Sequence, residues 1–274
     1  MQSDPILTRV VPELAEVGGV EAIALGGSRA RGTANASSDY DIGLYFSSTR
    51  PLDTDRLLQA VRTLVDNPDA AAVTPVGGWG PWIVGGAWLA VDGRKVDLLY
   101  RNLDEVGRVI DACRSGEITM DYQPGHPHGF CSAIWMGEVA LCQPLHDPRA
   151  ALTALKARTS PYPKLLGEAL IRRFRWEVSF AIDNAEIALA RGGQTHVAGC
   201  AYRALACTAQ VLFALNARYL INEKGALQEA ATFVRTIPDL AARATEIWRS
   251  IGDQDFATVL LSLRSLDRDL KALS

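Results

Sequence analysis

The sequence has few cysteines and none of the patterns that mark disulfide-rich or zinc-binding proteins. Its five cysteines form no CxxC pair, and an odd number leaves one thiol over in any disulfide scheme. Cys200 and Cys207 are spaced as on one helix face, so both are expected to face one core. We predict reduced thiols buried in apolar surroundings, the usual state in the cytosol. The cysteines are Cys113, Cys131, Cys142, Cys200 and Cys207.

The sequence also lacks an excess of positive charge and a targeting segment. It has 28 Lys and Arg against 31 Asp and Glu, a formal net charge of −3, which argues against broad, non-specific binding of nucleic acid. The N-terminus has neither the basic nor the apolar region of a signal peptide, and we find no apolar run of membrane-spanning length. We therefore expect a cytoplasmic protein without a membrane partner.

What is present is an ordinary globular composition, with 48% hydrophobic and 22% charged residues. Up to residue 147, strand and helix signals alternate with frequent glycine, whereas the rest of the chain is helical, for example over 164–191, where apolar residues recur at helical spacing. We predict an α+β fold, with a mixed-sheet catalytic domain at 1–147 and a helical bundle at 148–274. Helices are expected near 5–17, 53–67, 102–115, 164–191, 195–219, 227–234 and 240–251.

A Gly-Gly-Ser turn follows the apolar run at 20–25, which has the pattern of a buried strand or of a helix end. Gly26 and Gly27 would let backbone N–H groups approach a phosphate, because no Cβ stands in the way. Ser28 adds a hydroxyl donor. Arg29 and Arg31 add positive charge, and each could contact a triphosphate or lie solvated on the turn, with Arg31 the better candidate.

Two carboxylates, Asp39 and Asp41, stand at the start of a β-type segment that continues through residue 46. On a strand, residues i and i+2 point to the same face, so we expect both carboxylates to aim at one point. Hard oxygen ligands of this kind suit Mg²⁺ shared with the phosphates of a substrate.

A third carboxylate, Asp97, lies in the apolar run after the predicted Asp92-Gly93 hairpin turn. An acid in the middle of a strand needs a partner or a metal, because burying an unpaired charge is costly. The alternative is a solvent-facing acid on the hairpin.

Together, the turn at 26–32 and the Asp39-Tyr40-Asp41 motif resemble the signature of the DNA polymerase β-like nucleotidyltransferase superfamily. Within it, the chain is most similar to the antibiotic-type and minimal bacterial members. The resemblance implies that Asp39, Asp41 and Asp97 bind two Mg²⁺ ions and carry the catalysis, with Asp97 helping to deprotonate the acceptor hydroxyl. Gly26, Gly27, Ser28 and Arg31 would hold the triphosphate of ATP or another NTP.

In the helical half, the run at 219–224 ends a long apolar helix in polar residues. It resembles a block in antibiotic-type relatives that closes over the nucleotide, which implies Lys224 as a triphosphate ligand and Tyr219 or Asn222 as nucleoside contacts. The alternative is a helix-terminal cap, since a lysine near the last carbonyl groups is favourable in any case.

Two further segments keep more than one interpretation. The loop with His126 and His128 could hold a metal, line an acceptor pocket or be purely structural. Trp79, Trp82 and Trp88 fit core packing better than stacking on a base or a sugar ring, although both remain open.

The sequence thus predicts an Mg²⁺-dependent enzyme of the EC 2.7.7 type. It would transfer NMP, with AMP from ATP as the first choice, to a hydroxyl of a small molecule such as an aminoglycoside-like or other metabolite, and release pyrophosphate. The alternatives are transfer to a tRNA or a protein, and a non-catalytic antitoxin or binding module. Antibiotic-type relatives often build the site across a dimer, so the resemblance also implies a homodimer as one option.

Overall fold

The computed structural model describes residues 4–273, which divide into two compact units. The first unit comprises 4–111, 121–125 and 135–161, and the second comprises 112–120, 126–134 and 162–273. The domain boundary predicted after residue 147 lies inside the last segment of the first unit, and the domain division itself stays a prediction.

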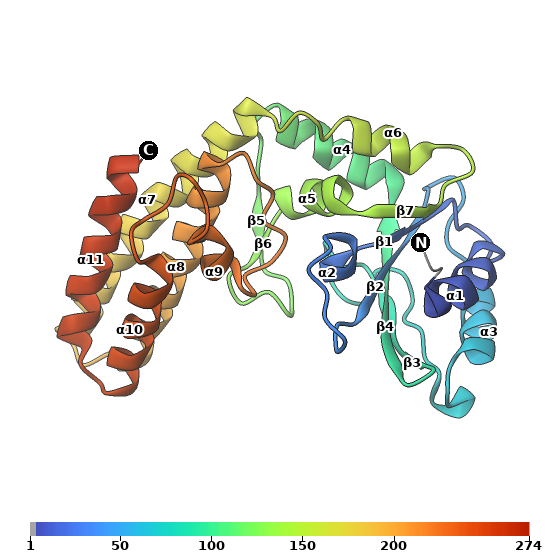
Figure 1. Ribbon diagram of the computed structural model, residues 1–274, viewed down its shortest axis with the longest axis horizontal. Helices are drawn as coiled ribbons and strands as arrows, with labels where there is room; N and C mark the ends of the chain where they lie inside the picture. Colours follow the sequence, from blue (N-terminus) through green and yellow to red (C-terminus); the bar gives the residue numbers. More distant parts are fainter. Residues whose placement is uncertain (1–3, 274) are drawn as a thin grey trace. The chain divides into compact units, whose positions relative to one another are not determined.

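The first unit is built on a five-stranded sheet with the strand order β3-β4-β2-β1-β7 (Figure 1). Strands β2 and β4 run parallel, and the other neighbours are antiparallel. The strands are β1 (Ala22–Leu25), β2 (Tyr40–Phe46), β3 (Gly86–Val91), β4 (Arg94–Asn102) and β7 (Gln143–His146). The helices are α1 (Pro5–Ala15), α2 (Gly27–Ala30), α3 (Thr54–Leu64), the 3₁₀ turn η1 (Pro68–Ala70) and α6 (Ala151–Ala157).

Local signals in the sequence explain where several of these elements begin and turn. The Asp4 carboxylate caps α1 by accepting hydrogen bonds from two backbone N–H groups, and Pro5 occupies the first helical position. Asp53 caps α3 by accepting one such hydrogen bond, from the Arg56 N–H. Asp92 and Gly93 have φ values of 49° and 68°, as the tight hairpin between β3 and β4 requires.

One face of the sheet forms the core of the first unit. Because side chains alternate along a strand, Ile42 and Leu44 on β2 and Val96 and Leu98 on β4 point to this face, and all four are buried. Helices α1 and α3 cover it with apolar side chains, and Figure 1 shows both helices on the same side of the sheet.

The opposite face carries a buried ion pair. Arg101 on β4 is only 2% exposed, and its guanidinium donates two hydrogen bonds, of 2.9 and 2.8 Å, to one carboxylate oxygen of Glu138 on α5 (Ala133–Leu141). Tyr45 on β2 is buried beside this pair, and burial raises the pKa of its phenol. This half of the face is therefore closed, whereas Asp41 and Asp97, nearer the starts of the same strands, stay half-buried.

The second unit is mainly helical. Helices α7 (Lys164–Leu189) and α8 (Gln194–Leu215), close to the helices predicted at 164–191 and 195–219, form an antiparallel pair joined at Gly192 and Gly193. Short helix α9 (Ala226–Ala230), α10 (Leu240–Gly252) and α11 (Phe256–Leu273) follow. Helix α4 (Leu103–Arg114) and β5 (Met120–Asp121) cross from one unit into the other, as does α5, and β6 (Phe130–Cys131) belongs to the second unit. The predicted α+β class is confirmed.

Helix α8 corrects one statement of the sequence analysis. Its 22 residues are long and apolar enough to cross a membrane, with a mean hydropathy of 1.3 over an 18-residue window, although we expected no such run. However, 78% of that window is buried, as in the core helix of a globular protein. All five cysteines are free, as predicted, and four are buried while Cys200 is half-buried.

The buried ion pair supports a stability prediction. Changing Glu138 to Ala leaves the Arg101 guanidinium buried without its carboxylate, so we expect the free energy of unfolding to fall by about 3 kcal/mol. Glu105→Ala is the matched control, since its partner Arg108 is exposed and such pairs contribute at most about 1 kcal/mol. Urea unfolding measures the free energy of unfolding of both variants. Equal losses would contradict the conclusion that the Arg101–Glu138 pair contributes more to stability than an exposed ion pair does.

Candidate functional site

The Gly-Gly turn is fastened directly to the strand that carries Asp41. The Gly26 N–H donates a 2.7 Å hydrogen bond to the Asp41 carbonyl oxygen. Gly27 begins α2 at a φ of +59°, and a Cβ built there would lie only 1.8 Å from Asp41 Oδ2. The Asp41 carboxylate therefore occupies the space that any other residue at position 27 would fill. The structure brings together the turn and the acid that the sequence singled out.

Asp41 and Asp97 are neighbours across the parallel strands. Asp41 on β2 is the register partner of Asp97 on β4, so both side chains leave the same face of the sheet on strands about 4.8 Å apart. Asp39 differs from the expectation, because β2 begins at Tyr40 and leaves Asp39 in the preceding loop. The alternation of a strand therefore does not fix the direction of Asp39.

Arg29 has a structural task beside these acids. Its Nε and Nη2 donate to the carbonyl oxygens of Asp39 and Ser38 at 3.1 and 2.7 Å, and its guanidinium lies 3.7 Å from the centroid of the Tyr40 ring. These contacts hold the loop that enters β2. Arg31, by contrast, is the exposed C-cap residue of α2, and Ser28 is half-buried within that helix.

The chemistry of the paired carboxylates fits a divalent cation. Asp41 and Asp97 present hard oxygen atoms to one region of the open half of the face, as Mg²⁺ requires. Among residues 4–273, however, no group of three or more His, Cys, Asp and Glu side chains gathers closely enough to form a complete metal site. The two-metal arrangement and the role of Asp39 in it stay predictions.

A tryptophan extends the row of carboxylates across the sheet. Trp88 on β3 is the register partner of Asp97, and it is 72% exposed. Its ring stacks on that of Trp79, with centroids 4.5 Å apart and an interplanar angle of 20°. One face of the Trp88 ring is packed, as expected for these tryptophans, but most of the Trp88 side chain is open to solvent.

Gln123, which the sequence analysis did not single out, holds the loop that carries Trp79. Its Oε1 accepts hydrogen bonds from the backbone N–H groups of Trp82 and Ile83, and its Nε2 donates to the Trp79 carbonyl oxygen at 3.2 Å. The side chain is 1% exposed. Because these partners lie about 40 positions away in the chain, no local sequence pattern could have revealed them.

The nucleoside contacts predicted in the helical half belong to the second unit. Tyr219 packs on Tyr162, with ring centroids 4.9 Å apart, and burial raises the pKa of its phenol. The Asn222 side chain accepts a hydrogen bond from the Lys224 N–H, a turn that supports the cap alternative, and Lys224 is exposed. Their nucleotide-binding roles stay predictions.

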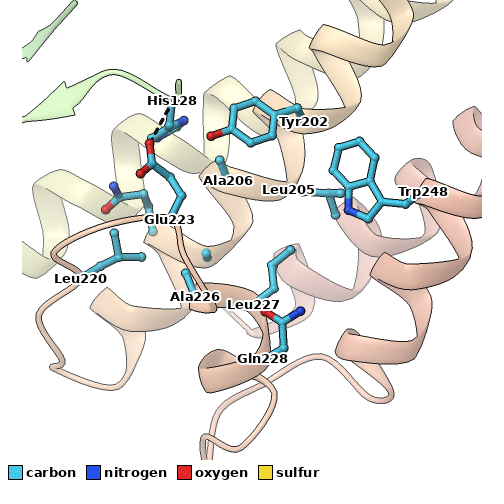
Figure 2. Close-up of a pocket in the computed structure, with 12 residues that line it drawn as sticks. His128, Tyr202, Leu205, Ala206, Leu220, Glu223, Ala226, Leu227, Gln228 and Trp248 are labelled. Carbon is cyan, nitrogen blue, oxygen red and sulfur yellow. Dashed lines mark hydrogen bonds between the residues drawn. The ribbon is translucent and has the colours of Figure 1, made fainter. Parts of the chain in front are cut away.

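Glu223, between these residues, lines a cavity of about 190 Å³ in the helical unit (Figure 2). Its Oε1 accepts a hydrogen bond from the His128 N–H at 3.0 Å, and Leu227 and Trp248 form part of the apolar wall. The cavity is smaller than the roughly 300 Å³ at which ligand pockets usually begin.

His128 is a buried, neutral anchor of its loop. Arg203 contacts both its Nδ1, at 3.1 Å, and its carbonyl oxygen. A guanidinium has only donors, so Nδ1 accepts and Nε2 carries the proton. Burial, followed by the charges of Arg203 and Arg173, lowers the pKa of His128 to about 3. These contacts favour the structural interpretation of the loop.

A comparison with family models assigns the first part of the chain. Residues 7–112 match the nucleotidyltransferase domain family. The match includes the Gly26-Gly27 turn, Asp41 and Asp97, and it confirms the resemblance to polymerase β-like nucleotidyltransferases. Members of this family generally use an NTP and a divalent metal.

The other comparisons add little to this assignment. No curated protein matches the chain. Among solved structures, it is similar to a nucleotidyltransferase-like protein from Exiguobacterium sibiricum 255-15, at 12% identity and a TM-score of 0.45, over 95% of this chain and 72% of that one. A likeness this remote carries no argument about function.

The contact between Gly27 and Asp41 can be tested with a matched pair of glycines. Gly27→Ala places a methyl group on the Asp41 carboxylate, whereas Gly32→Ala has the same kind of positive φ, +70°, and nothing within 4 Å. Both variants incur backbone strain of about 1 kcal/mol. We expect only Gly27→Ala to lower Mg²⁺-dependent binding of ATP, by at least tenfold in equilibrium dialysis. Equal affinities for the two variants would show that Asp41 can move aside without consequence.

The low pKa of His128 predicts how stability changes with pH. The unfolded chain binds a proton at His128 below about pH 6.5, whereas the folded protein does not until about pH 3. The protonation of His128 therefore costs the folded protein no stability above pH 6.5. Below that pH, it lowers the free energy of unfolding by up to about 1.4 kcal/mol per pH unit as the pH drops toward 3.

Urea unfolding at pH 7 and pH 5 measures this dependence. His128→Asn, which keeps an acceptor for Arg203, should lose less stability between the two pH values than the unaltered protein. His196→Asn is the control, because His196 is exposed. The same pH dependence in the unaltered protein and in His128→Asn would contradict the assignment.

Proposed function

We propose that the protein transfers a nucleoside monophosphate, AMP from ATP in the first instance, to a hydroxyl group of a small molecule. The observation that carries the proposal is the contact of the Gly26-Gly27 turn with Asp41, which is itself in register with Asp97. This arrangement sets a phosphate cradle beside two half-buried acids on one face of the sheet. The nucleotidyltransferase domain supports the general reaction.

The residues of the first unit divide the work as follows. The backbone N–H groups of the turn and the Ser28 hydroxyl hold the β- and γ-phosphates. Asp41 and Asp97, with Asp39 as a further ligand, are the residues that would hold a divalent cation beside the phosphates. The cation, when bound, neutralises charge on the phosphates and on the leaving pyrophosphate.

Asp97 has a second task in this proposal. It accepts the proton of the acceptor hydroxyl as that oxygen bonds to the α-phosphorus and the bond from phosphorus to the pyrophosphate oxygen breaks. Positioning and charge stabilisation supply most of the catalysis in reactions of this type. The reaction therefore depends on the placement of Asp41 and Asp97 more than on any unusual reactivity of either.

The net charge supports a small acceptor. At −3, the chain is poorly suited to a long polyanion, and a hydroxylated metabolite, including a cationic one, suits it better. We propose a cytoplasmic location, which the buried position of the long apolar helix α8 supports. Nucleoside contacts by Tyr219, Asn222 and Lys224, and a homodimer, belong to the same proposal.

Label transfer tests the reaction. Protein, Mg²⁺ and each α-³²P-labelled NTP are incubated with a metabolite extract, bulk tRNA or the protein alone. We expect label in the metabolite fraction, with ATP as the best donor. Asp41→Asn and Asp97→Asn each remove a negative ligand and should lower the rate at least 1,000-fold, which corresponds to about 4 kcal/mol of the activation barrier.

Asp69→Asn provides the control, because this aspartate is exposed in η1, on the chain segment before the tryptophan loop. Its rate should match that of the unaltered protein. Label in the tRNA or protein fraction would replace the small acceptor with a macromolecule. Transfer that survives both active-site substitutions, or no transfer at all, would refute the proposed enzyme.

A further inference from the structure

Trp79 and Trp88 form a stacked pair that lies at the surface. Trp88, the outer ring, faces solvent and is not packed in the core. Trp88 is 72% exposed, and Trp79 covers only one face of its ring. Large exposed aromatic surfaces are rare on soluble proteins, and they often mark binding sites. This pair lies on the face of the sheet that carries the acids.

The register of the strands places the pair in a definite order. Trp88 on β3 is opposite Asp97 on β4, Asp97 is opposite Asp41 on β2, and the Gly26 N–H binds the Asp41 carbonyl oxygen. One row therefore runs across the sheet from the tryptophan, through both acids, to the glycine turn. Three strand spacings of about 4.8 Å make this row roughly 14 Å long.

In-line displacement gives the two ends of the row different tasks. The attacking and leaving oxygens lie on opposite sides of the phosphorus. If the leaving pyrophosphate is held at the glycine turn and the α-phosphorus lies over the acids, the acceptor must enter from the side of Asp97 that carries Trp88. Cross-strand partners have Cβ atoms about 5 Å apart, so a hydroxyl group near Asp97 brings its own molecule against the tryptophan ring.

We infer that Trp79 and Trp88 form the acceptor-binding surface of the proposed transferase, and that they select acceptors with a ring next to the attacked hydroxyl group. The inference rests on the proposed function for the direction of attack. A sugar-like ring would lay its C–H face on Trp88, and an aromatic ring would stack on it. The shared chemistry is a ring that presents a face of C–H bonds or π electrons to the indole, with a hydroxyl group at its edge.

The surface is held in place before any ligand arrives. The Trp79 ring lies against Gly86. A Cβ at this position would come within 1.9 Å of the Leu98 carbonyl oxygen on β4 and 3.0 Å of Trp79 Cζ3, so the glycine makes room for the neighbouring strand and for the ring. Gln123 fixes the loop through its hydrogen bonds with the backbone of Trp79 and Trp82. The Trp82 indole N–H also donates to the Asp121 carboxylate at 3.0 Å. A rigid stack loses little entropy on binding, as an effective recognition surface requires.

The test compares the binding of ring-bearing alcohols with that of ringless ones. myo-Inositol is paired with glycerol, and phenol with 1-propanol, and the affinity of each is measured by saturation-transfer NMR. We expect at least one ring-bearing probe to bind better than its ringless partner. Trp88→Ala should lower that affinity about three- to tenfold, and Trp88→Phe, which keeps a flat ring, should retain most of it.

Trp176→Ala serves as the matched control, because Trp176 is also exposed, at 62%, and also stacked, on Phe180. It should bind the ring probes like the unaltered protein. Affinity for ATP with Mg²⁺, measured by equilibrium dialysis, should stay within twofold in every variant. Whether the inositol or the phenol pair responds distinguishes a sugar-like acceptor from an aromatic one.

Three results would overturn the inference: no preference for rings, a preference that persists in Trp88→Ala, or a Trp88→Ala variant that loses ATP affinity instead. The last would make the pair a contact for the nucleobase. Because binding is measured without turnover, the two proposals fail separately. Ring binding that depends on Trp88, without label transfer that depends on Asp41, would leave the surface standing and remove the transferase.

Discussion

The candidate site depends on the pairing of two parallel strands. Strands β2 and β4 are distant in sequence, and only their backbone ladder sets Asp41 level with Asp97. A slip of one residue in this register would turn one acid into the apolar core and bring Ile42 or Leu98 to the surface. The apolar residues that alternate with the acids therefore do more than fill the core: because they must point toward α1 and α3, they determine where both carboxylates lie.

The same alternation divides the second face of the sheet into a closed half and an open one. Arg101 follows Asp97 on the same face of β4, and its buried pairing with Glu138 keeps α5 on that half. The acids lie beyond the covered part and remain half-buried. Partial burial suits their proposed task, since the carboxylates need access for a cation and phosphates while water is partly excluded. The core and the site are thus two results of one strand pattern.

What the sequence could predict follows from how local each signal is. The Asp92-Gly93 hairpin and the glycine turn are short patterns, and each appears where expected. The helices predicted near 5–17 and 53–67 also begin close to those positions, because Asp4 and Asp53 cap them. Helix α5 was missed because it is apolar all round and buried, so it shows no helical period. Helix α11 lies outside the predicted helices although its apolar residues recur at helical spacing. The role of Gln123 could not be predicted, because the fold brings its partners to it from about 40 residues away. The alternation of side chains along a strand does not apply to Asp39, because β2 starts one residue later.

The two ends of the row of residues across the sheet also differ in how local the contacts are that hold them in place. The glycine turn and its acid are fixed by a short segment and one strand pairing, so their chemistry can persist while the rest of the chain changes. The tryptophan loop depends on Gln123, about 40 residues away, and on the space left by Gly86. A change at Gln123 acts on the loop of Trp79 and on none of the contacts between the glycine turn and Asp41. Such an arrangement allows the acceptor to change while the transfer chemistry is retained, because the two ends of the row share only the acids between them.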